Sequence, residues 1–186
     1  VYSIRIPAVL LGGLALLLFY WWARRCYSSG AALLALALAA ADPSYLFTAR
    51  LDWGPVLLSH VFMAAGLLLG TLWYQNTSAP PNPPGAKLAS DGTTISDARR
   101  MLFLGGAGFC FGLGLWDKAT FIWFLASLAA SLLVLFPTRV LQVLRPRAVA
   151  IFAGCLIIGS LPLLVYNVES GRQGTSEMVR LEELRG

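Results

Sequence analysis

The sequence has few charged residues, since Asp, Glu, Lys and Arg together make up 12% of its 186 positions. Soluble domains carry about 25% charged and about 45–50% apolar residues. This chain is instead 58% hydrophobic, with a mean hydropathy of +0.70. The shortage of charge excludes an ordinary soluble domain and indicates a protein of the lipid bilayer.

Metal-ligating and nucleic-acid-binding patterns are also missing. The three cysteines, Cys26, Cys110 and Cys155, are far apart, so we expect no metal site and no cofactor. A net charge of +5 is not gathered into a basic run, so we expect no nucleic-acid partner. His60, the one histidine, is more often a packing or hydrogen-bonding residue in such a helix than a proton carrier or ligand.

Long apolar runs predict an all-α membrane protein, a bundle of about six transmembrane helices. Each crossing needs roughly 20 apolar residues. The 36 residues of Met101–Phe136 are too long for one crossing, so we expect two helices joined at Asp117-Lys118. Asp42-Pro43 predicts a further helix break, because proline disfavours helix in the residue before it. The expected divisions are three helices in 1–74 with a loop near 42–54, a proline-rich linker at 75–100, three helices in 101–167, and a further segment at 168–186.

Glycines recur in the expected fourth crossing, where Gly108 and Gly112 form a pattern of small residues four apart. Such spacing is typical of closely packed membrane helices. A phosphate-binding glycine loop is excluded, since the strand before it and the lysine-serine pair after it are missing.

The distribution of lysine and arginine predicts which connections face the cytoplasm. One set of alternate connections holds eight of these residues and the opposite set holds three, namely Arg5, Arg50 and Lys118. We therefore expect the linker at 75–100 to be cytoplasmic. Residues 42–54, 116–118 and the chain after Tyr166 are then expected on the outer face.

Several polar residues at the expected outer helix ends are candidates for a binding site, because charges bordering a bilayer usually pair or serve a function. In one interpretation they are solvated interface charges. In the other, Lys118 or Arg50 neutralises a phosphate while carboxylates orient a polar substrate. The candidates to line such a site are Asp42, Asp52, Trp116, Asp117, Tyr166 and Asn167.

Four stretches resemble the GT-C class of integral-membrane glycosyltransferases, namely bacterial relatives of the protein mannosyltransferases and of the lipid A aminoarabinose transferase (glycosyltransferase families 39 and 83). Their membrane region is similar to this chain in its Arg-x-Pro start, its arginine-then-acid segment, its glycine-rich helix ending in lysine, and its last crossing. The matching stretches are Ile4–Gly12, Phe47–Asp52, Phe111–Lys118 and Leu161–Asn167.

The resemblance implies a multi-pass enzyme, expected in the bacterial inner membrane, that transfers a hexosyl or pentosyl unit from a polyprenyl-phosphate-linked donor at the extracytoplasmic face. It implies that Lys118 and Arg50 contact the donor phosphate. The family's catalytic acid lies in an outer loop upstream of the region matching Val1, so we expect this chain to be a fragment that is inactive alone. Asp52 is a further candidate for the base, and the acceptor is open.

Two other interpretations remain. The same outer charges are compatible with the vestibule of a multi-pass transporter or lipid flippase, although transporters place such groups near the bilayer midplane. A non-catalytic assembly subunit is the third interpretation.

Overall fold

The structure, a computed structural model, describes residues 2–51, 56–77, 95–138, 140 and 145–183, and α-helix is the regular structure throughout these ranges. The all-α prediction is therefore confirmed for this part of the chain. The helices are α1 (Tyr2–Cys26), α2 (Ser29–Ala41), α3 (Pro43–Leu51), α4 (Val56–Thr77), α5 (Ile95–Asp117), α6 (Phe121–Leu135) and α8 (Pro146–Glu183).

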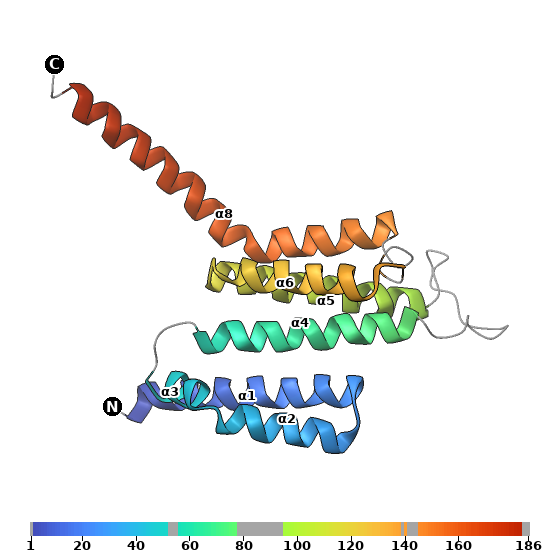
Figure 1. Ribbon diagram of the computed structural model, residues 1–186. Helices are drawn as coiled ribbons and strands as arrows, with labels where there is room; N and C mark the ends of the chain where they lie inside the picture. The colour runs from blue at the N-terminus through green and yellow to red at the C-terminus, as the bar shows by residue number, and fades with distance from the viewer. Residues whose placement is uncertain (1, 52–55, 78–94, 139, 141–144, 184–186) are drawn as a thin grey trace.

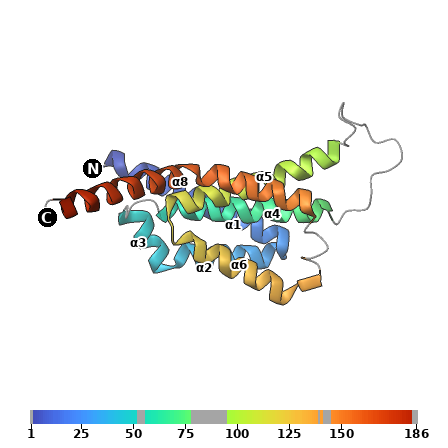
Figure 2. The same ribbon diagram turned by 90° about the horizontal axis from the view of Figure 1, so that it is seen from above.

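Four long helices form a row in which α1 packs on α4, α4 on α5, and α5 on α8 (Figure 1). The two shorter apolar helices α2 and α6, together with α3, lie on one side of this row (Figure 2). α2 packs against α1, whereas α6 contacts α5 mainly near the turn that joins them. α1 and α4 run in the same direction, as do α5 and α8, because the shorter helices α2 and α6 return the chain between them, whereas α4 and α5 run in opposite directions. With α2 and α6 counted, the connections alternate between the two ends of the bundle.

Both predicted helix breaks are confirmed. α2 ends before Asp42, whose backbone is extended with φ −63° and ψ 119°. Its Oδ1 atom accepts hydrogen bonds from the backbone N–H of Ser44 at 2.7 Å and of Tyr45 at 3.4 Å, which caps α3. At the second break α5 ends at Asp117, and α6 begins at Phe121.

Several helices extend beyond the expected boundaries. α4 continues to Thr77 and α5 begins at Ile95, so helix covers both edges of the expected linker. Its middle, 78–94, lies outside the described residues. α8 continues past Asn167 to Glu183 and includes most of the expected segment 168–186. Its axis bends part-way along (Figure 1), and it contains Pro162, which removes one helical hydrogen bond.

Glycine brings the backbones of α5 and α8 into direct contact. A Cβ atom added at Gly108 would lie 2.5 Å from the carbonyl oxygen of Phe152. One added at Gly112 would lie 2.9 Å from the Cα atom of Gly159. The predicted close packing is confirmed, and the partner helix is α8. We call this contact, formed by Gly108, Gly112, Phe152 and Gly159, the glycine seam.

Phe111 fills the centre of the bundle and is 5% exposed. Its ring centroid lies 6.1–6.3 Å from those of Phe121, Phe124 and Phe152, which come from α6 and α8. On its other side, α4 presents Gly66, where a Cβ atom would collide with the Phe111 ring. The core thus joins four helices through one aromatic side chain and a glycine that makes room for it.

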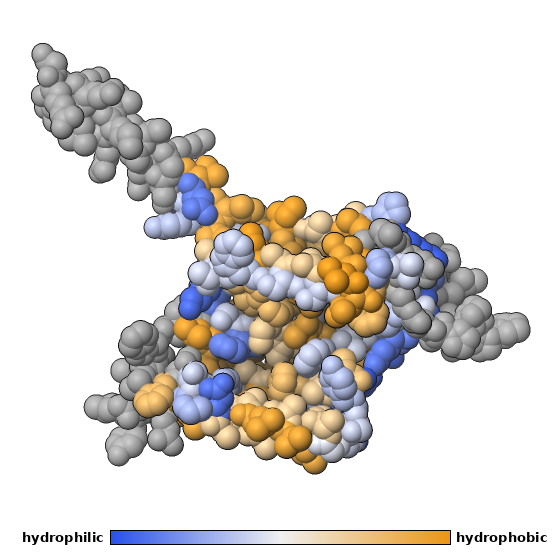
Figure 3. Space-filling model, viewed as in Figure 1, coloured by the Kyte–Doolittle hydropathy of each residue, from blue (hydrophilic) through white to orange (hydrophobic). Residues whose placement is uncertain are grey.

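The outside of the bundle is largely apolar (Figure 3). Three described helices are long and apolar enough to cross a membrane, namely Ile6–Cys26, Val56–Thr77 and Pro146–Glu169. Leucines such as Leu10 and Leu38 are about two-thirds exposed, a placement that lipid tolerates and water does not. These features indicate a helical membrane protein with several crossings. The total of six crossings stays a prediction.

Candidate functional site

One end of the bundle holds the α2–α3 junction, the first turn of α4 and the α5–α6 junction (Figures 1 and 2). We call it the junction end. Its described polar residues are Asp42, Ser44, Tyr45, Ser59, His60, Asp117 and Lys118.

Tyr45 fixes the short helix α3 against its neighbours. Its hydroxyl donates a hydrogen bond of 2.6 Å to the carbonyl oxygen of Gly12 in α1. Its ring stands edge-on to the ring of His60 in α4, with centroids 6.0 Å apart and an interplanar angle of 85°. Burial raises the pKa of the Tyr45 hydroxyl, which keeps it protonated and able to donate.

His60 lies in the first turns of α4. Its Nδ1 atom is 2.7 Å from the carbonyl oxygen of Val56, which also accepts a 2.7 Å hydrogen bond from the Ser59 hydroxyl. A carbonyl oxygen only accepts, so Nδ1 carries the hydrogen and Nε2 of the neutral ring is an acceptor. The hydrogen-bonding role expected for His60 is present, and the side chain also faces a cavity.

The cavity has a volume of about 230 Å³ and is lined by Asp42, Ser44, Tyr45 and His60. It joins the capping turn of α3 to the start of α4. Only Asp42 among these residues was among the candidate site residues from the sequence. Ser44 and His60 were missed, although each follows a proline-marked helix start, at Pro43 and Pro55 respectively.

Asp117 links the end of α5 to the start of α4. The backbone N–H of Ser59 donates a hydrogen bond to its carboxylate, and Oδ2 is covered without a hydrogen-bond partner among the described residues. The first N–H groups of a helix have no partner within it and attract negative charge. Burial nevertheless raises the pKa of Asp117 to about 6, against the opposing effects of Ser59 and the Lys118 charge.

Lys118 and Trp116 are exposed beside Asp117. The backbone of Lys118 closes the end of α5, because its N–H donates to Gly114 at 3.0 Å. The backbone of Lys118 is therefore fixed at the junction end by this turn, and its side chain is exposed there.

The remaining candidates are not brought to the cavity. Tyr166 and Asn167 are exposed on α8, and the Asn167 amide donates to the Leu163 carbonyl at 3.0 Å in the same helix. Arg50 belongs to α3, but its side chain lies outside the description, and so does the whole of Asp52. The structure thus brings Asp42 and His60 to one cavity, and it joins Asp117, the neighbour of Lys118 in the chain, to Ser59.

The described residues offer no set of ligands for a metal ion. Within the ranges that the structure describes, no group of three or more His, Cys, Asp or Glu side chains is placed to hold a metal ion. A second hollow of about 300 Å³ is bordered by Leu164, Val165, Val168 and Glu169. These residues all belong to α8, so this hollow gathers no groups from separate helices.

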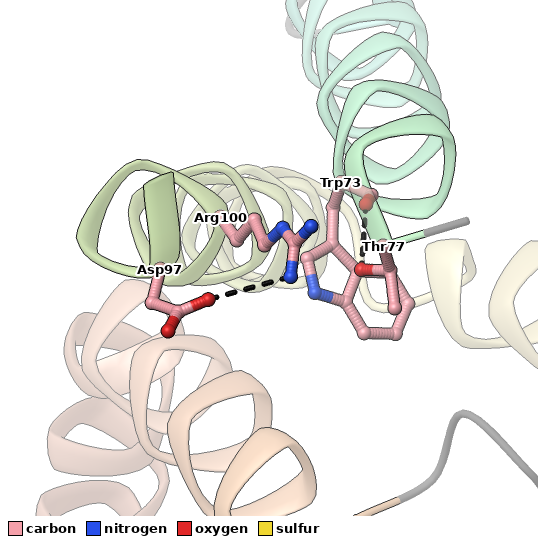
Figure 4. A network of polar contacts seen from close by, with 4 residues as sticks. All are labelled: Trp73, Thr77, Asp97 and Arg100. Carbon is pink, nitrogen blue, oxygen red and sulfur yellow. Dashed lines mark hydrogen bonds and ion pairs between the residues drawn. The ribbon is translucent and has the colours of Figure 1, made fainter. Parts of the chain in front are cut away.

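The opposite end of the bundle is built differently (Figure 4). Arg100 pairs with Asp97 one turn earlier in α5, with 3.3 Å between Nη1 and Oδ1, and its guanidinium lies beside the Trp73 indole. The Thr77 hydroxyl donates to the Trp73 carbonyl at 2.9 Å within α4. Arg99 lies over the Phe103 ring at 5.5 Å. Arg100 thus pairs locally and Arg99 covers an aromatic ring, and neither lines a described cavity.

Comparison with family models, with curated proteins and with solved structures finds no match for this chain. The residues of the junction end and the resemblance in the sequence are therefore what indicates a function for this chain.

Proposed function

We propose that this chain is the membrane portion of a glycosyltransferase that takes a sugar from a polyprenyl-phosphate donor at the extracytoplasmic face. The observation that carries the proposal is the gathering of Asp42, His60, Asp117 and Lys118 at one end of an apolar bundle. A lipid-linked donor keeps its tail in the bilayer and its phosphate at this level, where helix ends present polar groups.

Lys118 and Arg50 are the proposed contacts of the donor phosphate. When the bond between sugar and phosphate breaks, negative charge grows on the leaving phosphate, and a fixed cation stabilises that charge. Hydrogen bonds between a cation and a phosphate are about twice as strong as neutral ones. The base that deprotonates the acceptor is proposed to lie upstream of this chain, with Asp52 as the alternative.

The proposal includes six crossings and a bacterial inner-membrane location. Support comes from the alternation of the connections. The end opposite the junction end carries Arg24 and Arg25 on α1, Arg99 and Arg100 on α5, and Arg145 and Arg147 around the start of α8. Such enrichment is typical of the cytoplasmic side. The junction end would then face outward.

A transporter or flippase is the second candidate, favoured by one observation. The helix break at Asp42 borders a cavity, and transporters often bind substrate at discontinuous helices. Those sites lie near the bilayer midplane, whereas this break lies at the end of the row of long helices (Figure 1). The end position favours a transferase.

The test is Lys118→Ala in the full-length protein, reconstituted in lipid nanodiscs. We expect sugar transfer and the affinity for bare polyprenyl phosphate to fall together by about 10–100-fold, the loss of a hydrogen bond to a charged group of about 1.5–3 kcal/mol. Arg147→Ala, an exposed cation at the other end, is the matched control. Unchanged transfer and affinity in Lys118→Ala would remove Lys118 from the site. Net movement of the lipid across vesicles without sugar transfer would favour the transporter.

A further inference from the structure

The cavity of the junction end presents hydrogen-bond acceptors. Both described hydrogen bonds of the Asp42 carboxylate go to Oδ1, which leaves Oδ2 for a ligand. In the neutral imidazole of His60 with its hydrogen on Nδ1, Nε2 is also an acceptor. A ligand that satisfies both groups must supply donors, as the hydroxyl groups of a sugar do.

The size and the wall of the cavity set a limit on the ligand. Drug-sized ligands occupy pockets of about 300–1,000 Å³, and this cavity holds about 230 Å³. It therefore suits one small ring rather than a chain of several. The Tyr45 ring gives it an apolar wall, and the hydroxyl bond to Gly12 holds that wall in place.

The cavity also lies next to the proposed phosphate contact. Asp117 binds the backbone of Ser59, and the next residue of α4 is His60. Asp117, the neighbour of Lys118 in the chain, and the cavity residue His60 are therefore held at the same turn of α4. In a polyprenyl-phosphate sugar, the ring is bonded directly to the phosphate, so neighbouring sites for the two groups match the ligand.

We propose that this cavity binds the sugar unit of the donor, with the Asp42 carboxylate and Nε2 of His60 accepting hydrogen bonds from its hydroxyl groups. This inference rests on the proposed function, and it adds a sugar site and two residues that select the donor. Asp42 and His60 are positioned by the α3 cap and by the Val56 carbonyl, so both acceptors are held in place before the ligand arrives.

The experiment measures binding to the full-length protein in lipid nanodiscs. The probes are bare polyprenyl phosphate and the same lipid linked to glucose, mannose, galactose or arabinose. The readout is the ratio of the Kd for the bare lipid to the Kd for the best sugar-linked lipid. His60→Phe keeps a ring against Tyr45 and removes Nε2. Asp42→Asn keeps an oxygen for the α3 cap and removes the charge.

We expect the wild-type ratio to be tenfold or more, and each variant to lower it about tenfold while the Kd for the bare lipid stays unchanged. Ser127→Ala, which removes an exposed hydroxyl on α6, is the control and keeps the wild-type ratio. A ratio that survives both His60→Phe and Asp42→Asn overturns the sugar site and leaves the proposed function standing. A wild-type protein that neither binds the bare lipid nor transfers sugar overturns the proposed function and this inference with it.

Discussion

The glycine seam and the junction end hold helices together by opposite means. In the seam, α5 and α8 touch through backbone atoms, with Gly112 against Gly159 and Gly108 against the Phe152 carbonyl. At the junction end, a side chain of one helix bonds to the backbone of another, as the Tyr45 hydroxyl does to the Gly12 carbonyl. The seam has no space for a ligand and presents no polar side chain. The junction end has a cavity and polar side chains that line it.

This difference separates stability from function in the bundle. Contact between backbones gains dispersion energy at every atom and needs no hydrogen bond, which suits a bilayer where lipid is as apolar as leucine. Asp42 and His60 each use one polar atom for a backbone group and keep another for a ligand. We expect substitutions in the seam to act on folding, and substitutions at the junction end to act mainly on binding.

The largest expected effect is that of Gly159→Leu. A Cβ atom there would meet the Phe109 carbonyl oxygen at 2.5 Å and the Gly112 Cα at 3.0 Å, so α5 and α8 must separate. Overpacking costs about 1–3 kcal/mol, and more where only backbone is available to move. We expect a loss of about 3 kcal/mol or more in the free energy of unfolding, measured by SDS titration in mixed micelles.

Gly154→Leu is the matched control in the same helix, because nothing lies within 4 Å of a Cβ atom at that position. We expect it to be neutral or to stabilise by up to about 1 kcal/mol, since leucine has the higher helix propensity. Equal losses in the two variants would show that the seam is not a close contact.

The next effect is that of Asp42→Ala, which removes the oxygen that caps α3 at Ser44 and Tyr45. We expect a loss of about 1 kcal/mol in the free energy of unfolding, the usual worth of such a cap. Asp42→Asn keeps a capping oxygen and should unfold like the wild type in the same titration. If both variants lose the same stability, the charge rather than the cap holds α3.

A smaller effect is expected from Tyr45→Phe, which removes the hydroxyl that donates to Gly12. A single neutral hydrogen bond contributes about 0.5–1.5 kcal/mol, and we expect the lower end because Gly12 lies within α1, where its carbonyl keeps a helical partner. The measurement is again the free energy of unfolding. Thr71→Val, which removes the acceptor of the Trp22 indole at 3.2 Å, gives a comparison within the α1–α4 interface. A loss above 2 kcal/mol for Tyr45→Phe would contradict a role limited to one hydrogen bond.

A final effect depends on pH. The pKa of Asp117 is raised from 3.8 to about 6 in the folded protein, so the folded state holds its proton more tightly than the unfolded chain does. Its contribution to stability is complete below about pH 4 and is lost as the pH rises through 6. We expect the Tm of Asp117→Asn to be higher than that of the wild type at pH 7 and equal to it at pH 4. A constant difference in Tm across this range would rule out the titration of Asp117 as its cause.

Local chemistry made part of the fold predictable. The break at Asp42-Pro43 follows from the restriction that proline places on its neighbour, and the break after Asp117 follows from charge inside a run too long for one crossing. Glycine spacing predicted a close contact but not its partner, because any helix with small residues fits such a face. The continuation of α8 past Tyr166 was missed, since a change from apolar to charged composition ends a membrane segment without ending a helix.

The candidate site was predictable only in part for a related reason. Charges at helix ends are visible in the sequence, and Asp42, Asp117 and Lys118 were found in that way. His60 was interpreted as a packing or hydrogen-bonding residue of its own helix, because nothing local shows that the start of α4 lies against the capping turn of α3. The contact between Tyr45 and His60 joins residues from separate helices, and only the packing of those helices reveals it.

α8 is long and bent, so its last part extends away from the bundle (Figure 1). The 38 residues of this helix measure about 57 Å at ~1.5 Å per residue, nearly twice the ~30 Å of hydrocarbon in a bilayer. Pro162, within α8, follows Gly159 by less than one turn. The part of α8 beyond the bend projects past the junction end (Figure 1). Gly159, which lies close to Gly112 of α5, therefore precedes the proline of this helix by three residues. A force on the projecting part of α8 would therefore be transmitted to the glycine seam.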